Sequence, residues 1–369
     1  MTRRFRFLGL AAGVALALAL VGVGTSAATA SPTQPAHHHH VSTNRLWVNW
    51  WDGSAWHWTD QGRPPGGIAF GAGALTYQGN PYAFVRTHYG ALWANWWDGA
   101  AWHWANLGKP SGGIAGSIGT IAYQGNPYVF VRTYTGHLAV SYWNGTTWQW
   151  ADQGTVPGGV AGSVGTVLYQ GNPYVFVRSG SGELWVNYWD GTAWHWADQG
   201  KPDGGVQFGV GVTTYQDNPY VFVRASDGHL WVNYWDGTAW HWSDQGTRPY
   251  GIKGAVGVTT YQGNPYAFVR TGAGNLAVNY WDGSAWHWAF QGHPDGGIRF
   301  GVGVTTYNSN PYVFVRTSDS HLRVRFWDGS AWHWANQGTV PGGIAGPVGI
   351  AAYNGNPYVF VFSPSSDDD

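Results

Sequence analysis

Short runs of alternating apolar and polar residues, separated by turn residues, recur along most of the chain. In the stretch from Phe208 to Gly246, residues Gly209–Tyr215 are β-branched and punctuated by glycine, and Tyr220–Arg224 alternate as a second run. Leu230–Trp235 and Ala239–Ser243 form a third and a fourth run, joined by an Asp-Gly pair. Period-two alternation between turn residues predicts four antiparallel strands, and helical periodicity is absent.

This four-strand unit repeats without any insertion. Asn-Pro-Tyr and Trp-(Asp/Asn)-Gly each recur seven times at an interval of 46 residues. The tryptophans of the second motif are Trp51, Trp97, Trp143, Trp189, Trp235, Trp281 and Trp327. Such a unit buries its faces only against its neighbours, so the fixed period predicts a propeller or a solenoid. The glycines of the first strand suit an innermost position, and a turn is expected at 216–219.

The two ends of the repeat array distinguish a propeller from a solenoid. The array opens with third- and fourth-strand patterns at Leu46–Trp51 and Ala55–Trp58, and it closes with first- and second-strand patterns at Pro347–Tyr353 and Tyr358–Phe362. The two halves complete one unit from both termini, which closes a ring and removes exposed sheet edges. The predicted fold class is therefore all-β, a single-domain seven-bladed β-propeller of four-stranded antiparallel blades at residues 45–362.

The first 30 residues predict export. Three arginines precede the apolar stretch Phe7–Val23, and Ala28–Ala30 is typical of a cleavage site, so residues 1–30 are expected to be a signal peptide. The general secretory and the twin-arginine routes both stay open, because Arg6 stands where a twin-arginine signal prefers an apolar residue. The mature protein is expected to be secreted, without stable membrane insertion.

Low sequence complexity marks the two flanks of the repeats. Residues 31–44 are rich in His, Pro and Ser and are predicted to be a flexible lead-in, and residues 363–369 a disordered acidic tail. The run His37–His40 in the lead-in could bind metal weakly. The chain has no cysteine, so an exported protein of this sequence would rely on packing rather than on disulfides.

Composition narrows the class of partner. Charged residues make up only 10% of the chain, and 18 basic residues nearly balance 19 acidic ones. This composition lacks the basic face that nucleic acid requires. Aromatic residues make up 17%, with 27 Trp, which is more than a core of this size ordinarily uses and predicts a flat aromatic ligand face.

The repeated motifs resemble those of a lectin family. The set Trp-Asp-Gly-(Ser/Thr)-Ala-Trp-His-Trp, Asp-Gln-Gly-x-Pro and Asn-Pro-Tyr-Val-Phe-Val-Arg is similar to that of the PLL-like seven-bladed propeller lectins, named for a Photorhabdus lectin. The resemblance extends from Leu46 to about Phe362. It implies binding of fucose or O-methylated glycans in shallow pockets between neighbouring blades.

Aromatic and planar polar side chains form the candidate carbohydrate site of each unit. A ring covers the apolar C–H face of a sugar, while amides and imidazoles hydrogen-bond to its hydroxyls. Alternation places Trp231 and Asn233 on the face opposite Leu230 and Val232, and the fourth strand adds His241. The candidate sugar-binding residues are Trp47, Asn49, His57, Trp93, Asn95, His103, Trp185, Asn187, His195, Trp231, Asn233, His241 and Asn279.

Differences among the units separate ligand candidates from packing candidates. The Trp47 position holds Ala139, Ala277 and Arg323 in three units, and the Asn49 position holds Ser or Arg in two, so four of up to seven sites keep both residues. The tryptophans at the Trp51 and Trp56 positions occur in every unit and are interpreted as blade packing. The variable set is assigned to the ligand face; the alternative is that these tryptophans merely cover a neighbouring blade.

No metal or cofactor is predicted for the repeats. Each histidine of the His57 position stands without a chelating partner at metal-ligand spacing, and Gln149 replaces it in one unit. Arginines at the Arg86 position could be inter-blade ties or sugar donors, and the inter-blade tie is favoured.

Two other classes of protein were weighed against a lectin. A glycan-cleaving propeller enzyme needs a unique pair of carboxylates, whereas the acids here belong to repeated turns and the single glutamate, Glu183, lies in a surface turn. The protein is therefore expected not to be an enzyme. A protein-interaction or surface scaffold stays open, because a propeller fold alone does not exclude it. The near-identity of the units favours a repeated ligand, and thus a secreted multivalent lectin whose partners are glycans or glycoconjugates.

Overall fold

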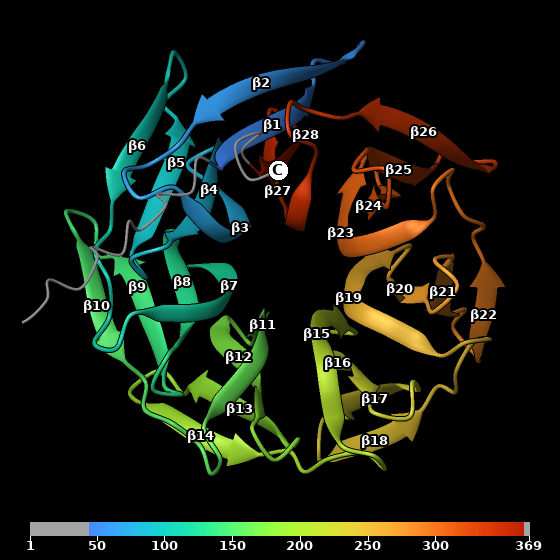
Figure 1. The fold of residues 1–369 in the computed structure, drawn as a ribbon. Helices are drawn as coiled ribbons and strands as arrows, with labels where there is room; N and C mark the ends of the chain where they lie inside the picture. Colours follow the sequence, from blue (N-terminus) through green and yellow to red (C-terminus); the bar gives the residue numbers. More distant parts are fainter. Residues whose placement is uncertain (1–43, 365–369) are drawn as a thin grey trace, which may run out of the picture. The chain divides into compact units, whose positions relative to one another are not determined.

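The described residues form a ring of seven four-stranded antiparallel sheets (Figure 1). The computed structural model describes residues 44–364, and the predicted signal peptide, the run His37–His40 and the last acidic residues lie outside that range. Within it, no helix is long and apolar enough to cross a membrane. The predicted all-β, seven-bladed propeller is confirmed.

Each of the seven blades contains four strands, which follow one another from the ring axis to the outer surface (Figure 1). Blade 1 consists of β3 (Ile68–Tyr77), β4 (Asn80–Thr87), β5 (Leu92–Trp97) and β6 (Trp102–Asn106). Blade 2 consists of β7 (Ile114–Tyr123), β8 (Asn126–Thr133), β9 (Leu138–Trp143) and β10 (Trp148–Asp152). Blade 3 consists of β11 (Val160–Tyr169), β12 (Asn172–Ser179), β13 (Leu184–Trp189) and β14 (Trp194–Asp198). Blade 4 consists of β15 (Val206–Tyr215), β16 (Asn218–Ala225), β17 (Leu230–Trp235) and β18 (Trp240–Asp244). Blade 5 consists of β19 (Ile252–Tyr261), β20 (Asn264–Thr271), β21 (Leu276–Trp281) and β22 (Trp286–Phe290). Blade 6 consists of β23 (Ile298–Tyr307), β24 (Asn310–Thr317), β25 (Leu322–Trp327) and β26 (Trp332–Gly338). Blade 7 consists of β27 (Ala345–Tyr353), β28 (Asn356–Ser363), β1 (Arg45–Trp51) and β2 (Trp56–Gly62).

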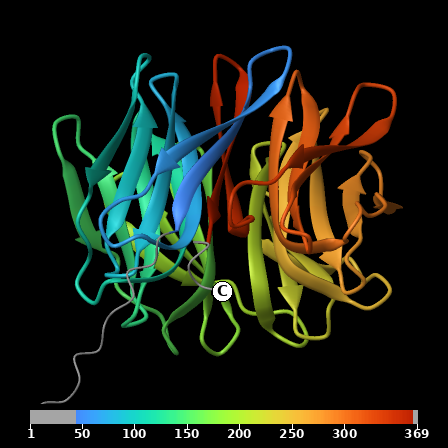
Figure 2. The same ribbon diagram turned by 45° about the horizontal axis from the view of Figure 1, so that its top comes forward.

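Blade 7 is assembled from both ends of the chain. The order of its strands is β2-β1-β28-β27, and β1 pairs antiparallel with β28 from Arg45 opposite Ser363 to Trp50 opposite Tyr358. Figure 2 shows this junction, with β1 in blue beside β28 in red. The split blade predicted from the ends of the repeat array is confirmed.

Glycine is required where the innermost strands of neighbouring blades approach each other. A Cβ atom on Gly165 of β11 would lie 2.6 Å from a methyl carbon of Val212 on β15. On Gly211 of β15, it would lie 2.7 Å from the backbone oxygen of Val256. Contacts this short do not occur between non-bonded atoms, so the innermost position predicted for these glycines is confirmed.

The hairpin between the first two strands is shorter than the sequence predicts. The expected turn at 216–219 reduces to Gln216 and Asp217, whose φ angles are 50° and 63°. Such positive angles in both central residues are typical of a two-residue type I′ hairpin. Pro219 is instead a strand residue, paired with Thr214 near the beginning of β16, where proline is tolerated.

An indole hydrogen bond joins every blade to the blade before it. The second tryptophan of the Trp-His-Trp motif, which is Trp-Gln-Trp in blade 2, donates from Nε1 to a backbone oxygen of the preceding blade at 2.6–3.0 Å in all seven cases. The bond from Trp58 to the Gln337 oxygen, 2.6 Å long, crosses from blade 7 to blade 6. It therefore helps to close the ring.

Aromatic contacts fill the same interfaces. The first tryptophan of each Trp-His-Trp motif lies edge-on against a fully buried phenylalanine of the preceding blade, as in Trp148 against Phe84 at 5.8 Å between ring centroids. The pairs Trp56–Phe314 and Trp240–Phe176 repeat this geometry. The predicted packing role of the Trp56 position is confirmed.

Arginine side chains also link the blades, as predicted. Arg86 Nη1 donates to the backbone oxygen of Ile114 in the next blade at 3.1 Å. Arg178, Arg224 and Arg270 reach the equivalent oxygens at 3.4–3.5 Å, which makes these bonds weak.

The ring-closing indole hydrogen bond can be tested by Trp58→Phe. The substitution leaves the Gln337 carbonyl without its donor, so we expect the free energy of unfolding to fall by about 1–3 kcal/mol beyond the loss caused by the smaller ring. Denaturant unfolding measures this change. Trp235→Phe is the matched control, because the Trp235 indole N–H is buried without a partner among the described residues. An equal decrease in the free energy of unfolding of the two variants would contradict a stabilising role of the Trp58–Gln337 hydrogen bond.

Candidate functional site

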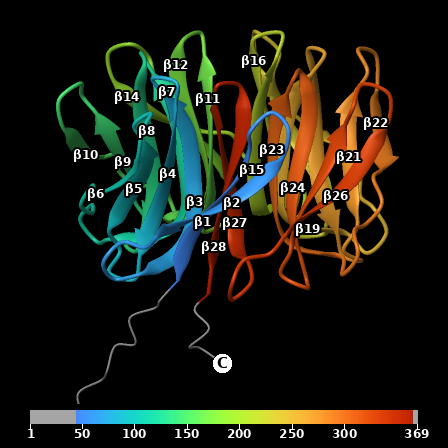
Figure 3. The ribbon, with the colours of Figure 1, turned by 90° about the horizontal axis from the view of Figure 1, so that it is seen from above.

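The clefts between blades open at one end of the ring, where the hairpins lie. Each blade places two hairpins there, one between its first and second strands and one between its third and fourth (Figure 3). Asp98 and its equivalents organise the second hairpin. Asp98 Oδ1 accepts hydrogen bonds from the backbone N–H groups of Ala100 and Ala101, both at 2.7 Å. The hairpins therefore hold the tryptophans next to them in fixed positions.

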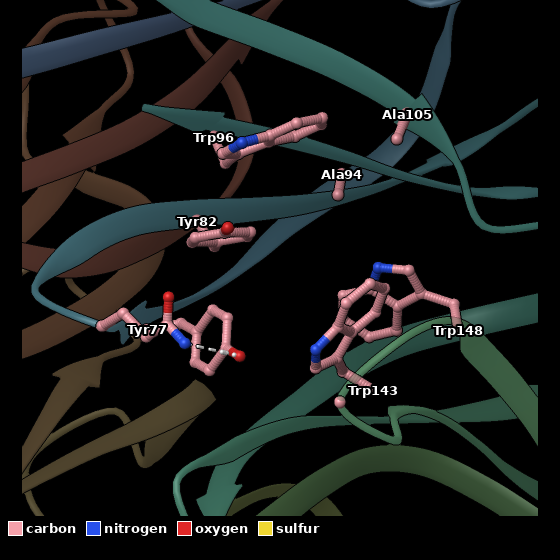
Figure 4. A pocket seen from close by; sticks show the side chains of 9 residues that line it. Tyr77, Tyr82, Ala94, Trp96, Ala105, Trp143 and Trp148 are labelled. Atoms are coloured by element: carbon pink, nitrogen blue, oxygen red, sulfur yellow. Dashed lines mark hydrogen bonds between the residues drawn. The ribbon is translucent and has the colours of Figure 1, made fainter. Parts of the chain in front are cut away.

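A cavity of about 450 Å³ lies at this end between blade 1 and blade 2. Strands β3 to β6 supply one wall and the floor, and the hairpin between β9 and β10 supplies the facing wall (Figure 4). The cavity is lined by Tyr77, Gln78, Tyr82, Ala94, Trp96, Ala105, Trp143, Gly145 and Trp148. None of these side chains carries a charge at neutral pH. The cavity is thus suited to an uncharged ligand.

Two groups of aromatic rings lie on opposite sides of this cavity. The rings of Tyr82 and Trp96 stack with centroids 6.0 Å apart and planes 13° apart, and His103 continues the ladder at 5.3 Å from Trp96. The opposite surface consists of Trp143 and Trp148, whose ring centroids are 5.9 Å apart. In Figure 4 the Tyr82 and Trp96 rings lie one above the other, seen edge-on, and the two tryptophans lie on the other side of the cavity. Flat aromatic faces of this kind bind the C–H face of a small ring.

Directed polar groups accompany the aromatic faces. The Tyr77 hydroxyl accepts a hydrogen bond from Gln78 Nε2 at 3.0 Å, and no described residue accepts a hydrogen bond from the Trp143 indole N–H. That N–H is also not sealed from solvent. Burial raises the pKa of Tyr82, so its hydroxyl stays protonated at neutral pH and keeps its capacity to donate. The cavity therefore offers hydroxyl, amide and indole groups to a ligand with hydroxyls.

Ala94 distinguishes this cleft from the other six. Every other blade has valine at the same position, as at Val48 and Val278. Ala94 lines the cavity, whereas a valine there would add two methyl groups to the floor. The exchange creates space for an apolar group about the size of a methyl.

A second cavity, of about 360 Å³, occupies the equivalent cleft between blades 5 and 6. Tyr266 and Tyr280 stack at 5.1 Å on one wall, and Trp327 and Trp332 lie on the other. Burial first, and then the neighbouring tyrosines, raise the pKa of Tyr266 to about 12. The cavity also contains Phe290 and Arg325, which no other blade has at these positions. The second cavity therefore shares the aromatic walls of the first but has a different polar rim.

Hydrogen bonds span two other clefts at the same level. Trp281 Nε1 donates to the Tyr215 hydroxyl at 3.1 Å between blades 4 and 5, and Trp51 Nε1 donates to the Tyr307 hydroxyl at 3.0 Å between blades 6 and 7. Trp143, the equivalent residue of the first cavity, makes no such bond. The clefts are therefore not equivalent, although their tryptophans and tyrosines are the same.

The variable tryptophans of the predicted site are partly buried and pack against the inter-blade cores. Trp47, Trp93, Trp185 and Trp231 each contact a buried hydrophobic cluster. The indole N–H groups of Trp185 and Trp231 are inaccessible to solvent, and Trp47 Nε1 donates to the Ser363 hydroxyl. None of the four lines either cavity. These positions match the alternative in which the tryptophans cover a neighbouring blade.

The predicted asparagines are buried as well. Asn49, Asn95, Asn187, Asn233 and Asn279 are at most 1% exposed. In each, Nδ2 donates to the backbone oxygen of the histidine on the fourth strand at 3.2–3.4 Å. These amides thus tie the third strand to the fourth, and the burial leaves no route from solvent to them.

The predicted histidines lie on the opposite face of the blade from the tryptophans and asparagines. His241 is directly across from Tyr234 in the register, and Tyr234 packs with Leu230 and Val232, as the alternation predicts. Each histidine of this position is held by the hairpin aspartate at 2.6–2.7 Å, in His57, His103, His195, His241, His287 and His333. Where Gln149 replaces the histidine, Asn144 replaces the aspartate.

The structure therefore does not bring the tryptophan, asparagine and histidine of one unit together on a single surface. Strand register explains the difference, because a residue opposite Tyr234 shares the face of Tyr234 and not that of Trp231. Binding of sugar by these thirteen residues stays a prediction.

The residues that line the first cavity are not among the sugar-binding residues predicted from the sequence. Trp143 and Trp148 belong to the invariant positions that are interpreted mainly as blade packing, and Tyr77 and Tyr82 are not among the candidates. The available signal was that tyrosine occurs at both of these positions in every repeat. Trp148 both packs against Phe84 and lines the cavity, so invariance within the repeat does not separate residues that only pack from residues that also line a cavity.

The single glutamate of the chain, Glu183, lies in a hydrogen-bonded group of side chains on blade 3 and the loop that follows it. Glu183 accepts hydrogen bonds from Ser179 and Ser181 and pairs with Lys201 at 3.0 Å. These contacts, the serines first, lower the pKa of Glu183 to about 2, which is opposite to the raised pKa of a general acid. Among the described residues, no three His, Cys, Asp or Glu side chains are grouped to hold a metal ion.

Solved structures of similar fold include propeller lectins, whereas no protein-family model and no curated protein sequence matches the chain. The BP39L lectin from Burkholderia pseudomallei is 19% identical, with a TM-score of 0.58, over 77% of this chain and 87% of that one. A mutant Aleuria aurantia lectin in complex with Fucα1-6GlcNAc is 15% identical, with a TM-score of 0.53, over 74% and 99%. AofleA from Arthrobotrys oligospora is 12% identical, with a TM-score of 0.52, over 82% and 95%. At these identities the likeness shows the propeller fold.

Blade number differs between this chain and one of these neighbours. The Aleuria aurantia lectin is a six-bladed propeller with a fucose recognition mode described as novel. Seven blades are present here. The shared feature is thus the blade and its radial arrangement, and residue roles do not transfer by position.

Because the hairpin aspartates have lowered pKa values, we expect the free energy of unfolding to decrease in acid. The variant Asp98→Asn tests this expectation. Hydrogen bonds from the backbone N–H groups of Ala101 and Ala100, and then His103, lower the pKa of Asp98 to about 2. A lowered folded-state pKa stabilises the fold above the unfolded value near 4, and this stabilisation is lost as the pH falls towards 2. The stability difference between the parent and Asp98→Asn should therefore shrink from pH 6 to pH 3 in denaturant unfolding. A difference that is constant with pH would contradict the assignment.

Proposed function

We propose that the protein is a multivalent lectin that binds neutral sugars in the aromatic clefts at the hairpin end of the ring. The observation that carries the proposal is the cavity between blades 1 and 2, with aromatic rings on both sides and an indole donor at Trp143 that has no partner among the described residues. One sugar ring would stack against Trp143 and Trp148, and its hydroxyls would bond to the Tyr77, Gln78 and Trp143 polar groups.

A 6-deoxy or O-methylated sugar is the proposed ligand class. Such a sugar carries a methyl group, and Ala94 leaves a methyl-sized space in the floor of the cavity where the other blades have valine. The absence of charged side chains from this cavity also favours a neutral ligand over an acidic one. The resemblance to the PLL-like lectins, and the fucose-containing ligand in one neighbouring lectin structure, agree with this class.

Multivalency would supply the strength of binding. A shallow cleft gives a modest affinity for one sugar, but several clefts on one rigid ring can engage a glycan-coated surface together. A signal peptide at residues 1–30 would deliver the protein to the outside of the cell, where such surfaces are present. Secretion is therefore part of the proposal.

The proposal predicts that Trp143→Ala removes one sugar site. Calorimetric titration with methyl α-L-fucoside should give a stoichiometry that is lower by one than that of the parent, because the substitution removes both a stacking face and the indole donor. The matched control is Trp281→Ala, which changes the equivalent residue where the indole is already bonded to Tyr215. This control should keep the stoichiometry of the parent.

A second variant separates a loss of the sugar site from a folding defect of Trp143→Ala. Ala94→Val introduces the residue found in the other six blades, so it should fold normally while filling the floor of the cavity. It should weaken binding at this cleft by about tenfold or more, equivalent to about 1.4 kcal/mol. Unchanged titrations of both Trp143→Ala and Ala94→Val would remove this cleft from the proposal.

A further inference from the structure

One position near the beginning of the innermost strand breaks the sevenfold repeat in three consecutive blades. Alanine occupies it in four blades, at Ala69, Ala115, Ala161 and Ala345. Blades 4, 5 and 6 carry Gln207, Lys253 and Arg299 instead. The exchange lies at the end of the ring opposite the hairpins and introduces two cations on neighbouring blades.

These two cations line a cavity of about 260 Å³ together with two arginines of the second strands. Lys253 and Arg299 contribute from β19 and β23, and Arg224 and Arg270 contribute from β16 and β20. No carboxylate lines this cavity, and among residues 44–364 none of the four cations forms a salt bridge. The axial cavity, as we call it, is therefore positively charged and without a counter-ion from the described chain.

Arg224 is buried in the wall of the axial cavity without a full set of partners. Its side chain is 8% exposed, and its Nε has no hydrogen-bond partner among the described residues. Its only described acceptor, the Ile252 oxygen, is 3.4 Å from Nη1. Burial, and then the charge of Arg270, lower the pKa of Arg224. A buried guanidinium with unused donors, next to a second guanidinium, would be stabilised by an anion.

Two phenylalanines complete the axial cavity. Phe208 and Phe300 are 37% and 38% exposed, and the Arg224 guanidinium lies 5.9 Å from the centre of the Phe208 ring. Exposed rings on both sides of a cationic site provide apolar faces for a compact ligand. The cavity is smaller than the roughly 300–1,000 Å³ typical of drug-sized ligands. It thus suits one small anionic ring.

We infer that the axial cavity is a second binding site, which takes the carboxylate or sulfate group of a small ring-shaped ligand such as a uronate sugar. Arg224, Arg270, Lys253 and Arg299 bind the oxyanion, and Phe208 and Phe300 flank the ring. Arginine suits this role because its planar donors match the geometry of an oxyanion. The site lies at the opposite end of the ring from the hairpin-end clefts and does not depend on sugar binding there.

The test uses sodium glucuronate, with glucose as the neutral counterpart, in calorimetry at constant ionic strength. Glucuronate should bind saturably and glucose should not. The double variant Lys253→Ala, Arg299→Ala restores the residue found in four other blades, so it should fold, and it should weaken glucuronate binding by at least about tenfold. The control Arg63→Ala, Lys109→Ala removes the same charge from loops outside the axial cavity and should bind glucuronate as the parent does.

The chain itself provides a second source of carboxylates, because its last three residues are Asp367–Asp369. The same titrations on a chain ending at Pro364 separate the two sources. Binding that appears only in the shortened chain would support the site and identify the acidic end as its competitor. Absence of saturable binding in both chains, or equal binding by the two double variants, would overturn the inference. Titration with methyl α-L-fucoside should be unaffected by either double variant.

Discussion

The inter-blade indole hydrogen bond is the interaction on which the rest of the ring depends. A four-stranded blade has two apolar faces and buries neither by itself, so its stability comes from its neighbours. The indole hydrogen bond of Trp58 and its equivalents fixes the angle between consecutive blades at the outermost strand. The edge-on contact of Trp56 and its equivalents with a buried phenylalanine fixes the same angle nearer the ring axis. Both contacts recur in all seven interfaces, including the one between blade 6 and blade 7, the blade that contains both chain ends.

This regular frame explains how clefts of similar sequence differ. Because the frame holds each hairpin tryptophan near a tyrosine of the preceding blade, a small change decides whether the two side chains bond to each other or leave space between them. Trp281 bonds to Tyr215, whereas Trp143 leaves its donor free beside the gap created by Ala94. The two ends of the ring also differ in charge, with a neutral aromatic cavity at the hairpin end and a cationic cavity at the other.

The fold could be predicted from the sequence because its period, turns and ends are all local signals. The 46-residue interval requires a repeated unit, and the incomplete patterns at Leu46 and Phe362 require closure. The prediction that Pro219 lies in the turn was wrong. Asn and Pro are typical of turns, so the sequence does not reveal that the turn ends at Asp217 and that Asn218 and Pro219 begin the next strand.

The site was harder to predict because it forms between blades. Alternation correctly separated Trp231 from Val232, but the face of His241 depends on the register across the hairpin, which composition does not reveal. The burial of Asn233 likewise depends on the blade packed over it. The pairing of Tyr82 and Trp96 with Trp143 and Trp148 joins residues of two units, so no analysis of one unit could identify it.

The central claim, that a neutral glycan binds at the hairpin end, is tested most directly by a glycan array with the chain beginning at Ser31, with and without a chelator. Selective binding to glycans that carry fucose or O-methylated sugars, unchanged by the chelator, is the expected result. A folded protein that binds no neutral glycan would contradict the lectin proposal and would favour a protein-interaction scaffold.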